Sequence, residues 1–166
     1  MSMSDRDGKI WMDGRLIEWR DATTHVLTHT LHYGMGVFEG LRAYDAPHGP
    51  AIFRLQAHTR RLFNSARIFQ LELPFDEATI GQACGQVIRA NAYGACYLRP
   101  LVWIGSQVLS IAATDNRIHV AVAGWPLGAY LGDEGMESGI RVKTSSFTRH
   151  HVNASMVRAK ACGHYI

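Results

Sequence analysis

The sequence predicts an α+β fold, in which two helices lie against a mainly antiparallel sheet. Short runs of β-branched and aromatic residues recur along the chain, and two amphipathic helical segments separate them without strict strand–helix alternation. The composition agrees, because 47% hydrophobic and 19% charged residues in a chain of 166 are typical of a folded protein with a sizeable core. We therefore expect a small two-layer α/β domain over residues 1–123, a connector over 124–133 and the start of a second, β-rich domain over 134–166.

A β-hairpin is the first element expected, over residues 10–19. Asp13-Gly14 accepts positive φ at both central positions of a tight turn, and bulky strand-forming residues flank the dipeptide. A segment of mixed strand and loop character follows at 25–32. Short strands are expected at 40–44 and 51–54, on either side of a loop rich in proline and glycine.

Two amphipathic helices follow these short strands. Over residues 56–70 the apolar side chains recur at helical spacing between arginines (Leu62, Phe63, Ala66 and Phe69). The second helix is expected to begin at Asp76, because a carboxylate at that position is a favourable N-cap, and to end near Asn91.

The later part of the chain has three further β-type segments, at 96–104, 118–123 and 140–145. Residues 153–166 have the pattern of the first turns of a helix, which then stops without a cap. This abrupt end indicates that the sequence is part of a longer protein.

Charge and composition argue against several classes of protein. The net charge of +3 is spread along the chain, without the block of like charge that favours nucleic acid or a membrane surface. No run reaches the roughly 18 to 20 apolar residues of a membrane span, and the N-terminus lacks a signal-peptide core. Cys84, Cys96 and Cys162 form no CxxC pattern and the nine histidines have no ligand spacing, so we expect free thiols, no metal site and a cytoplasmic protein.

Three glycines, Gly34, Gly36 and Gly40, lie close together before the first helix. They do not open a helix after a strand, so they are not a phosphate-binding loop. We expect them at backbone positions that need an unusual φ or a close approach. For the neighbouring Glu39 we expect a structural ion pair.

Six short motifs keep their order and spacing along nearly the whole chain. They are His32-Tyr33-Gly34-x-x-Val37-Phe38-Glu39-Gly40-x-Arg42-x-Tyr44, Phe53-Arg54, His58-x-x-Arg61-Leu62-x-x-Ser65-Ala66, Tyr97-x-Arg99-Pro100, Gly128-Ala-Tyr130-Leu-Gly132 and Ala159-Lys160-Ala161-x-Gly163-x-Tyr165. Together they resemble the branched-chain amino-acid aminotransferases, which are class IV aminotransferases and fold-type IV pyridoxal-phosphate enzymes. The chain of that family continues well beyond the last motif, which agrees with the abrupt end.

The resemblance implies pyridoxal 5′-phosphate as the cofactor. Lys160 would be the catalytic residue, which forms a Schiff base with the cofactor and then moves a proton during transamination. Tyr165 would donate to the phenolate oxygen of the cofactor. Arg61 would bind its phosphate with the forked donors of the guanidinium. The plain alternatives are a solvated lysine, a core tyrosine and a surface arginine.

The resemblance also implies a substrate pocket. Tyr97 and Arg99 alternate on one strand and therefore project from the same face, where Arg99 would meet the distal carboxylate of glutamate. The alternative for Arg99 is a structural ion pair, and the aromatic residues of the pocket could equally be core residues. The other residues expected on the substrate side are Tyr33, Phe38, Arg42 and Tyr130.

The function implied is exchange of an amino group between leucine, isoleucine or valine and 2-oxoglutarate, by a homodimer or larger homo-oligomer. Amino acids and 2-oxo acids are the expected partners, with neither nucleic acid nor membrane. One alternative is another enzyme of the same fold, a D-amino-acid aminotransferase or an aminodeoxychorismate lyase. Another is a catalytically inactive chain that only folds or oligomerises.

Overall fold

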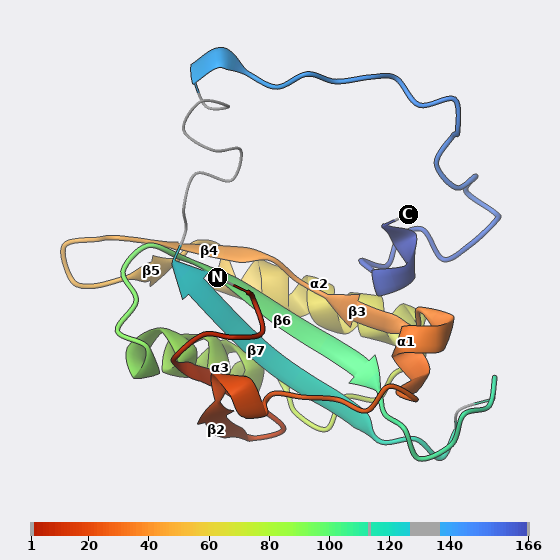
Figure 1. Ribbon diagram of the computed structural model, residues 1–166, viewed down its shortest axis with the longest axis horizontal. Helices are drawn as coiled ribbons and strands as arrows, with labels where there is room; N and C mark the ends of the chain where they lie inside the picture. Colours follow the sequence, from red (N-terminus) through yellow and green to blue (C-terminus); the bar gives the residue numbers. More distant parts are fainter. Residues whose placement is uncertain (1, 113, 127–136, 166) are drawn as a thin grey trace.

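The computed structural model describes residues 2–112, 114–126 and 137–165, and within them a seven-stranded antiparallel sheet forms the centre (Figure 1). The strand order is β2-β1-β7-β6-β4-β5, and β3 also pairs with β6. The strands are β1 (Lys9–Met12), β2 (Arg15–Glu18), β3 (Gly36–Phe38), β4 (Leu41–Tyr44), β5 (Ala51–Ile52), β6 (Cys96–Ile104) and β7 (Ile118–Pro126). The predicted α+β class with a mainly antiparallel sheet is confirmed.

Helices α2 (Leu55–Ile68) and α3 (Glu77–Ala90) cover one face of this sheet (Figure 1). The core lies between them and the strands, where Leu62, Ile80 and Leu98 are each 0% exposed. Strand β6 alternates between buried residues on the helix side and half-buried residues on the other face, which is the two-residue period of a strand. The face opposite the helices therefore presents Tyr97, Arg99 and Leu101.

Strands β3 and β4 share one register on β6, so the two residues between them, Glu39 and Gly40, lie opposite Pro100 and Arg99. The backbone N–H of Glu39 donates to the Pro100 carbonyl over 2.9 Å. Pro100 has no N–H to return this bond. The ladder is therefore interrupted at this point, next to the groups described below.

The hairpin and both long helices agree with the sequence prediction. Asp13 and Gly14 have φ of 49° and 97°, the positive values that a tight hairpin turn needs. Asp76 is the N-cap of α3, and its side chain accepts from the backbone N–H of Thr79 over 2.8 Å. Periodicity and cap chemistry were sufficient for these elements, because each is stabilised by local contacts as well as by the core.

Residues 25–32 differ from the mixed strand and loop that we predicted, because a short helix α1 occupies His29–Tyr33. Gly34 ends it in the left-handed region, at φ 70°, with its N–H bonded to the Thr30 carbonyl. His29 is fully buried, and its Nε2 pairs with the Ser110 carbonyl over 3.0 Å. A five-residue helix set by such tertiary contacts is too short to have a readable period.

The predictions for the last thirty residues were wrong in their secondary structure. Residues 140–145 form no strand with any described residue, and Val142 is 85% exposed. Residues 153–165 form turns and a 3-10 helix at Cys162–His164 rather than an α-helix. The backbone of Lys160 and Ala161 bonds to β3 and α2, which holds it extended and unavailable for helical bonds.

The proposed domain limits stay a prediction. Strand β7 ends at Pro126, so residues 124–126 of the predicted connector belong to the sheet. The rest of that connector, 127–133, lies outside the described residues. Over the described part of the chain, no helix has the length and apolar character of a membrane span.

Candidate active site

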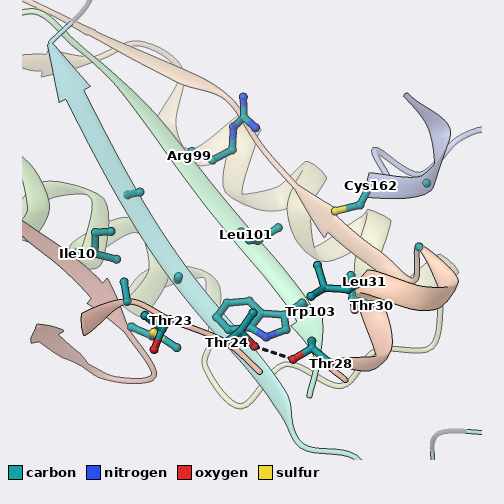
Figure 2. A pocket seen from close by; sticks show the side chains of 16 residues that line it. Ile10, Thr23, Thr24, Thr28, Thr30, Leu31, Arg99, Leu101, Trp103 and Cys162 are labelled. Carbon is teal, nitrogen blue, oxygen red and sulfur yellow. Dashed lines mark hydrogen bonds between the residues drawn. The ribbon is translucent and has the colours of Figure 1, made fainter. Parts of the chain in front are cut away.

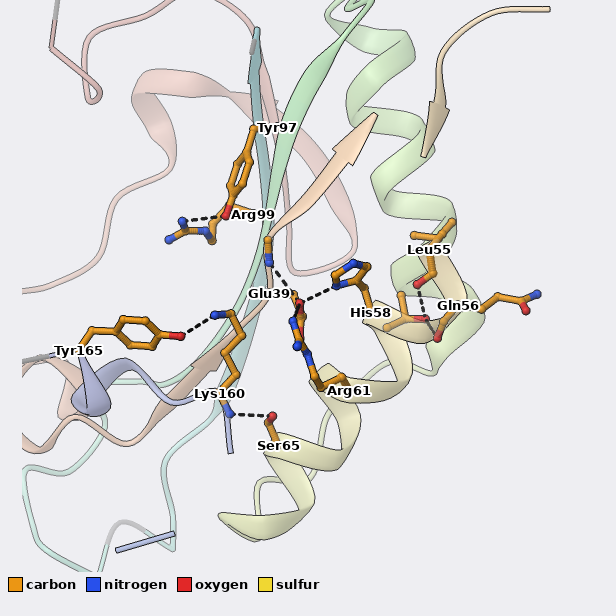
Figure 3. Close-up of polar contacts among 12 residues, drawn as sticks. Glu39, Leu55, Gln56, His58, Arg61, Ser65, Tyr97, Arg99, Lys160 and Tyr165 are labelled. Carbon is orange, nitrogen blue, oxygen red and sulfur yellow. Dashed lines mark hydrogen bonds and ion pairs between the residues drawn. The ribbon is translucent and has the colours of Figure 1, made fainter. Parts of the chain in front are cut away.

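The backbone around Lys160 is held between β3 and α2 (Figure 3). The N–H of Phe38 donates to the Lys160 carbonyl over 3.1 Å, and the Lys160 N–H donates to Ser65 Oγ over 3.0 Å. Ala161 forms a β-bridge with Val37. Ala161 and Ser65 are each 1% exposed, so this attachment is buried and places the Lys160 side chain at the end of β3.

The Lys160 amine lies within an aromatic cluster. Its Nζ is 2.5 Å from the Tyr165 hydroxyl and 4.6 Å from the centroid of the Phe38 ring. The rings of Phe38 and Tyr165 are 5.2 Å apart. An amine so close to a phenol and to aromatic faces has a defined position and hydrogen-bonding partner.

Gly34 and Gly163 allow the segment that carries Lys160 to approach the end of α1. Gly34 has φ 70°, and a Cβ at this residue would lie 3.1 Å from the Cα of Gly163. The N–H of Gly163 donates to the Gly34 carbonyl over 3.3 Å. Gly36 is similarly confined, since its Cβ would lie 2.8 Å from Thr30. The unusual φ and the close approach expected for these glycines are confirmed.

Arg61 lies on α2, one helical turn before Ser65, and forms a bidentate ion pair with Glu39 (Figure 3). Its Nη2 donates to Glu39 Oε2 over 2.8 Å, and its Nε donates to Oε1. His58 Nδ1 meets Oε2 over 2.9 Å. Glu39 is fully buried while the Arg61 side chain is 55% exposed, so the predicted structural ion pair of Glu39 is confirmed.

The electrostatics of this pair favour the charged forms. Burial raises the pKa of the Glu39 carboxyl, but the hydrogen bonds from Arg61 and His58 outweigh it, and the net pKa lies below the ordinary value. The hydrogen bond to Glu39 raises the pKa of Arg61. Both groups are therefore ionised at neutral pH.

Tyr97 and Arg99 lie side by side on the open face of β6, as the alternation predicted. Arg99 Nη2 donates to the Tyr97 hydroxyl over 3.1 Å, and the guanidinium carbon is 4.8 Å from the Phe38 centroid. A Cβ at Gly40 would lie 2.0 Å from the Tyr97 hydroxyl, so only glycine leaves room for it. Arg99 forms no ion pair with any carboxylate in the described ranges, and its buried Nε has no partner there.

The other predicted substrate residues are placed differently. Tyr33 is 45% exposed on α1, where its ring is 4.6 Å from that of His29. Arg42 is exposed on β4, opposite Tyr97 in the ladder and on the same face. Tyr130 lies outside the described residues. The structure thus gathers Lys160, Tyr165, Phe38, Arg99 and Tyr97, with Arg61 beside them.

Two residues that contact the candidate site, His58 and Ser65, were not singled out from the sequence. They flank Arg61 at positions i−3 and i+4, which puts all three on one face of α2. Both residues belong to the motif that contains Arg61. The spacing within that motif was the signal that could have identified them.

A cavity of about 540 Å³ runs along the open face of the sheet (Figure 2). Arg99 lies at one end and Trp103 at the other, with Leu101 between them and Cys162 on the side of the C-terminal segment. Lys160 is not among its lining residues. The cavity therefore adjoins the lysine cluster without containing its amine. Across residues 2–112, 114–126 and 137–165, no group of three or more His, Cys, Asp or Glu side chains is arranged to hold a metal ion.

Fold and site together are those of an antiparallel α+β domain that brings a lysine amine, a phenol and two arginines together where β3 ends. Residues 36–166 match the family described as amino-transferase class IV. The chain belongs to that family.

Two of the proteins similar to this chain have the same name. The chain is 58% identical to a branched-chain-amino-acid aminotransferase of Pseudomonas aeruginosa, over 100% of this chain and 54% of that protein. It is 39% identical to the Escherichia coli K12 protein of the same name, over 95% of this chain and 51% of the other. The resemblance to branched-chain aminotransferases is confirmed.

Solved structures agree with this family. The crystal structure of the Escherichia coli branched-chain amino acid aminotransferase gives a TM-score of 0.91 at 38% identity, over 96% of this chain and 53% of that one. A second branched-chain amino acid aminotransferase, crystallised with pyridoxamine 5′-phosphate, gives 0.89 at 44% identity, with 96% and 53% covered. The chain therefore spans about half the length of the relatives that it matches.

Proposed function

We propose that this chain supplies the catalytic lysine of a pyridoxal-phosphate-dependent branched-chain amino-acid aminotransferase. The observation that carries the proposal is the Lys160 amine, 2.5 Å from the Tyr165 hydroxyl and beside the Phe38 ring. Membership of the class IV family and 58% identity to the Pseudomonas aeruginosa protein support it. The reaction exchanges an amino group between leucine, isoleucine or valine and 2-oxoglutarate.

The described residues fit pyridoxal 5′-phosphate as the cofactor. When bound, this group supplies an aldehyde and an electron-accepting ring. Lys160 would hold it covalently and then move the proton at the substrate Cα. Tyr165 would donate its hydroxyl to the ring oxygen, and Arg61 would bind the phosphate through donors that Glu39 does not use. The pyridoxamine 5′-phosphate in the second solved structure supports this class of cofactor.

Arg99 is the proposed contact for the distal carboxylate of glutamate. Its guanidinium is held by Tyr97 and lies over Phe38, and it lines the cavity on the open face of the sheet. The Phe38 ring offers an apolar wall for a branched side chain. Tyr33, Arg42 and Tyr130 remain proposed substrate-side residues. We further propose a cytoplasmic homodimer, and sedimentation in solution would test its mass.

The lysine is tested in the protein expressed from its own reading frame. Replacing Lys160 by Ala should abolish the covalent adduct that borohydride traps with pyridoxal 5′-phosphate, and should reduce transamination of leucine by several orders of magnitude. Lys143, an exposed lysine of the same segment, is the matched control, and Lys143→Ala should leave both unchanged. An adduct that persists without Lys160 would overturn the assignment.

A substrate panel separates the alternatives. Leucine, isoleucine and valine should be converted with 2-oxoglutarate. Turnover of D-amino acids or of aminodeoxychorismate instead would reassign the chain within the same fold. We expect the 166-residue chain alone to bind the cofactor weakly and to turn over nothing.

A further inference from the structure

Glu39 has a place in the site that its structural ion pair alone does not explain. Its carboxylate is fully buried at the interruption between β3 and β4. Oε1 accepts from Arg61 Nε, while Oε2 accepts from Arg61 Nη2 over 2.8 Å, from His58 over 2.9 Å and from the Gly40 N–H over 3.3 Å. Because an ionised carboxylate can only accept, His58 Nδ1 is the donor. The carboxylate is thus fixed by the sheet and by α2 together.

The ion pair with Glu39 fixes the orientation of the Arg61 guanidinium and leaves some of its N–H donors unused. A guanidinium has five N–H donors, and Glu39 uses one on Nε and one on Nη2. Both donors on Nη1 and one on Nη2 remain, on a side chain that is 55% exposed. A long exposed arginine without such a partner would be spread over several rotamers, and ordering it on binding would weaken its contact with an anion. Because Glu39 already orders the Arg61 side chain, less conformational entropy is lost when an anion binds.

The same short stretch of chain also holds Lys160. The backbone N–H of Phe38 donates to the Lys160 carbonyl, and the next residue along the chain is Glu39. On α2, Arg61 lies four residues before Ser65, which accepts from the Lys160 N–H. Two adjacent residues of the sheet and two residues of one helix face therefore set the position of the amine relative to the guanidinium.

We propose that Glu39 is a positioning residue that aims the free donors of Arg61 at the cofactor phosphate, in register with the Lys160 amine. The inference rests on the proposed function, since it requires a phosphate-bearing aldehyde at Lys160. The negative charge of Glu39 also weakens the field of Arg61. The carboxylate, however, occupies the side of the guanidinium that carries Nε and one Nη2 donor, whereas a phosphate would meet the three free donors directly.

The test compares two ligands that differ only in the phosphate group. In the protein expressed from its own reading frame, affinities for pyridoxal 5′-phosphate and for pyridoxal are measured by absorbance titration. Glu39→Gln keeps the shape of the side chain but cannot accept both Arg61 bonds. We expect the variant to weaken the affinity for pyridoxal 5′-phosphate by about 10- to 100-fold, by analogy with the loss seen when residues that orient metal ligands are replaced. The affinity for pyridoxal should change by less than about twofold, because pyridoxal lacks the phosphate that Arg61 would bind. The exposed Glu72 gives the matched control, Glu72→Gln, which should alter neither affinity.

Each result decides one question. Equal losses for both ligands, or no loss for either, would overturn the role of Glu39 while the proposed function stands. A wild-type protein that binds neither ligand at Lys160 would overturn the proposed function, and with it this role. If Glu39→Gln does not fold, His58→Leu is used, since leucine has no side-chain donor and the carboxylate oxygen Oε2 loses the bond from His58. It should give a smaller loss that is again selective for the phosphate-bearing ligand, and an unselective loss would contradict the proposal.

Discussion

The sheet with its two helices and the segment 137–165 are ordered by different means. Leu98, at the centre of the sheet, is 0% exposed and belongs to a continuous core. In the later segment Val142 and Phe147 are 85% and 87% exposed. Among the hydrophobic residues of 137–165, which the structure describes, Ala159 and Ala161 are the buried ones. Apolar sequence alone therefore does not make a strand, because a strand also needs a partner edge and a face to cover.

This difference matters because Lys160 belongs to the less embedded region. The hydrogen bonds to Phe38 and Ser65 and the bridge to Val37 fix its backbone. These few contacts join Lys160 and Ala161 to β3 and α2, whose own positions are determined by a large buried core. The site is thus built by docking a short stretch onto a rigid surface, which is how binding residues are commonly positioned.

The largest expected effect is a direct comparison of the two regions. In the 166-residue chain, Leu98→Ala should lower the free energy of unfolding by about 2–5 kcal/mol, because it leaves a cavity in a closed core. Val142→Ala removes apolar atoms from an exposed side chain and should change the free energy of unfolding by less than about 0.5 kcal/mol. Urea unfolding followed by circular dichroism measures both. Similar losses for the two variants would mean that the segment 137–165 packs as tightly as the sheet.

A smaller effect is expected at the attachment point itself. Ala161 is 1% exposed against Val37, so Ala161→Leu would overpack this contact at a cost of about 1–3 kcal/mol. The segment should detach while the sheet remains folded. Hydrogen exchange read by mass spectrometry should therefore speed up in residues 159–165, whose amides are bonded at the attachment, and remain slow in β6.

The matched control for this variant is Val152→Leu, at a residue that is 79% exposed. It should leave exchange unchanged in both regions. Faster exchange throughout β6 in Ala161→Leu would show that the attachment and the sheet unfold as one cooperative unit.

What could be predicted from the sequence follows the same division. Strand 96–104 was predicted with its observed bounds, because alternation and burial act on the same residues. The Asp76 cap of α3 and the Asp13-Gly14 turn were predictable from local chemistry. The strand at 140–145 was wrong because its apolar pattern has no partner edge in the described chain. The helix predicted around Lys160 was wrong because its backbone bonds elsewhere.

Some of the residues that gather around Lys160 were predicted from the sequence, whereas their geometry was not, and their roles stay predictions. The motifs named Lys160, Tyr165 and Arg61, and the structure brings the first two into contact. Spacing gives no distance between residues of different elements, so the bidentate approach of Arg61 to Glu39 could not be read from it. The cavity along the open face, bounded by Arg99 and Trp103, depends on how the later segment docks and had no sequence signal.

The smallest expected effect is a pH dependence of the free energy of unfolding. It would show that part of the acid sensitivity comes from Glu39, which is buried between the sheet and α2. The pKa of Glu39 lies below its ordinary value of 4.5 in the folded chain, because the bonds from Arg61 and His58 outweigh burial. A carboxyl with a lowered folded pKa stabilises the fold above its unfolded pKa, and this stability is lost as the pH falls through the folded value. Since Arg61 is 55% exposed, water screens the pair and the contribution should stay below about 1 kcal/mol.

The measurement is the difference in unfolding free energy between the wild-type chain and Glu39→Gln, followed from pH 7 into the acid range. This difference should be constant at neutral pH and should shrink once the pH falls below the ordinary pKa of a glutamate, because the wild-type carboxyl then becomes neutral as well. Glu72→Gln, on an exposed residue, should differ little from wild type at every pH. A Glu39→Gln difference that stays constant into acid would show that the ion pair does not stabilise the folded chain. The acid sensitivity would then have to be sought in the segment that carries Lys160.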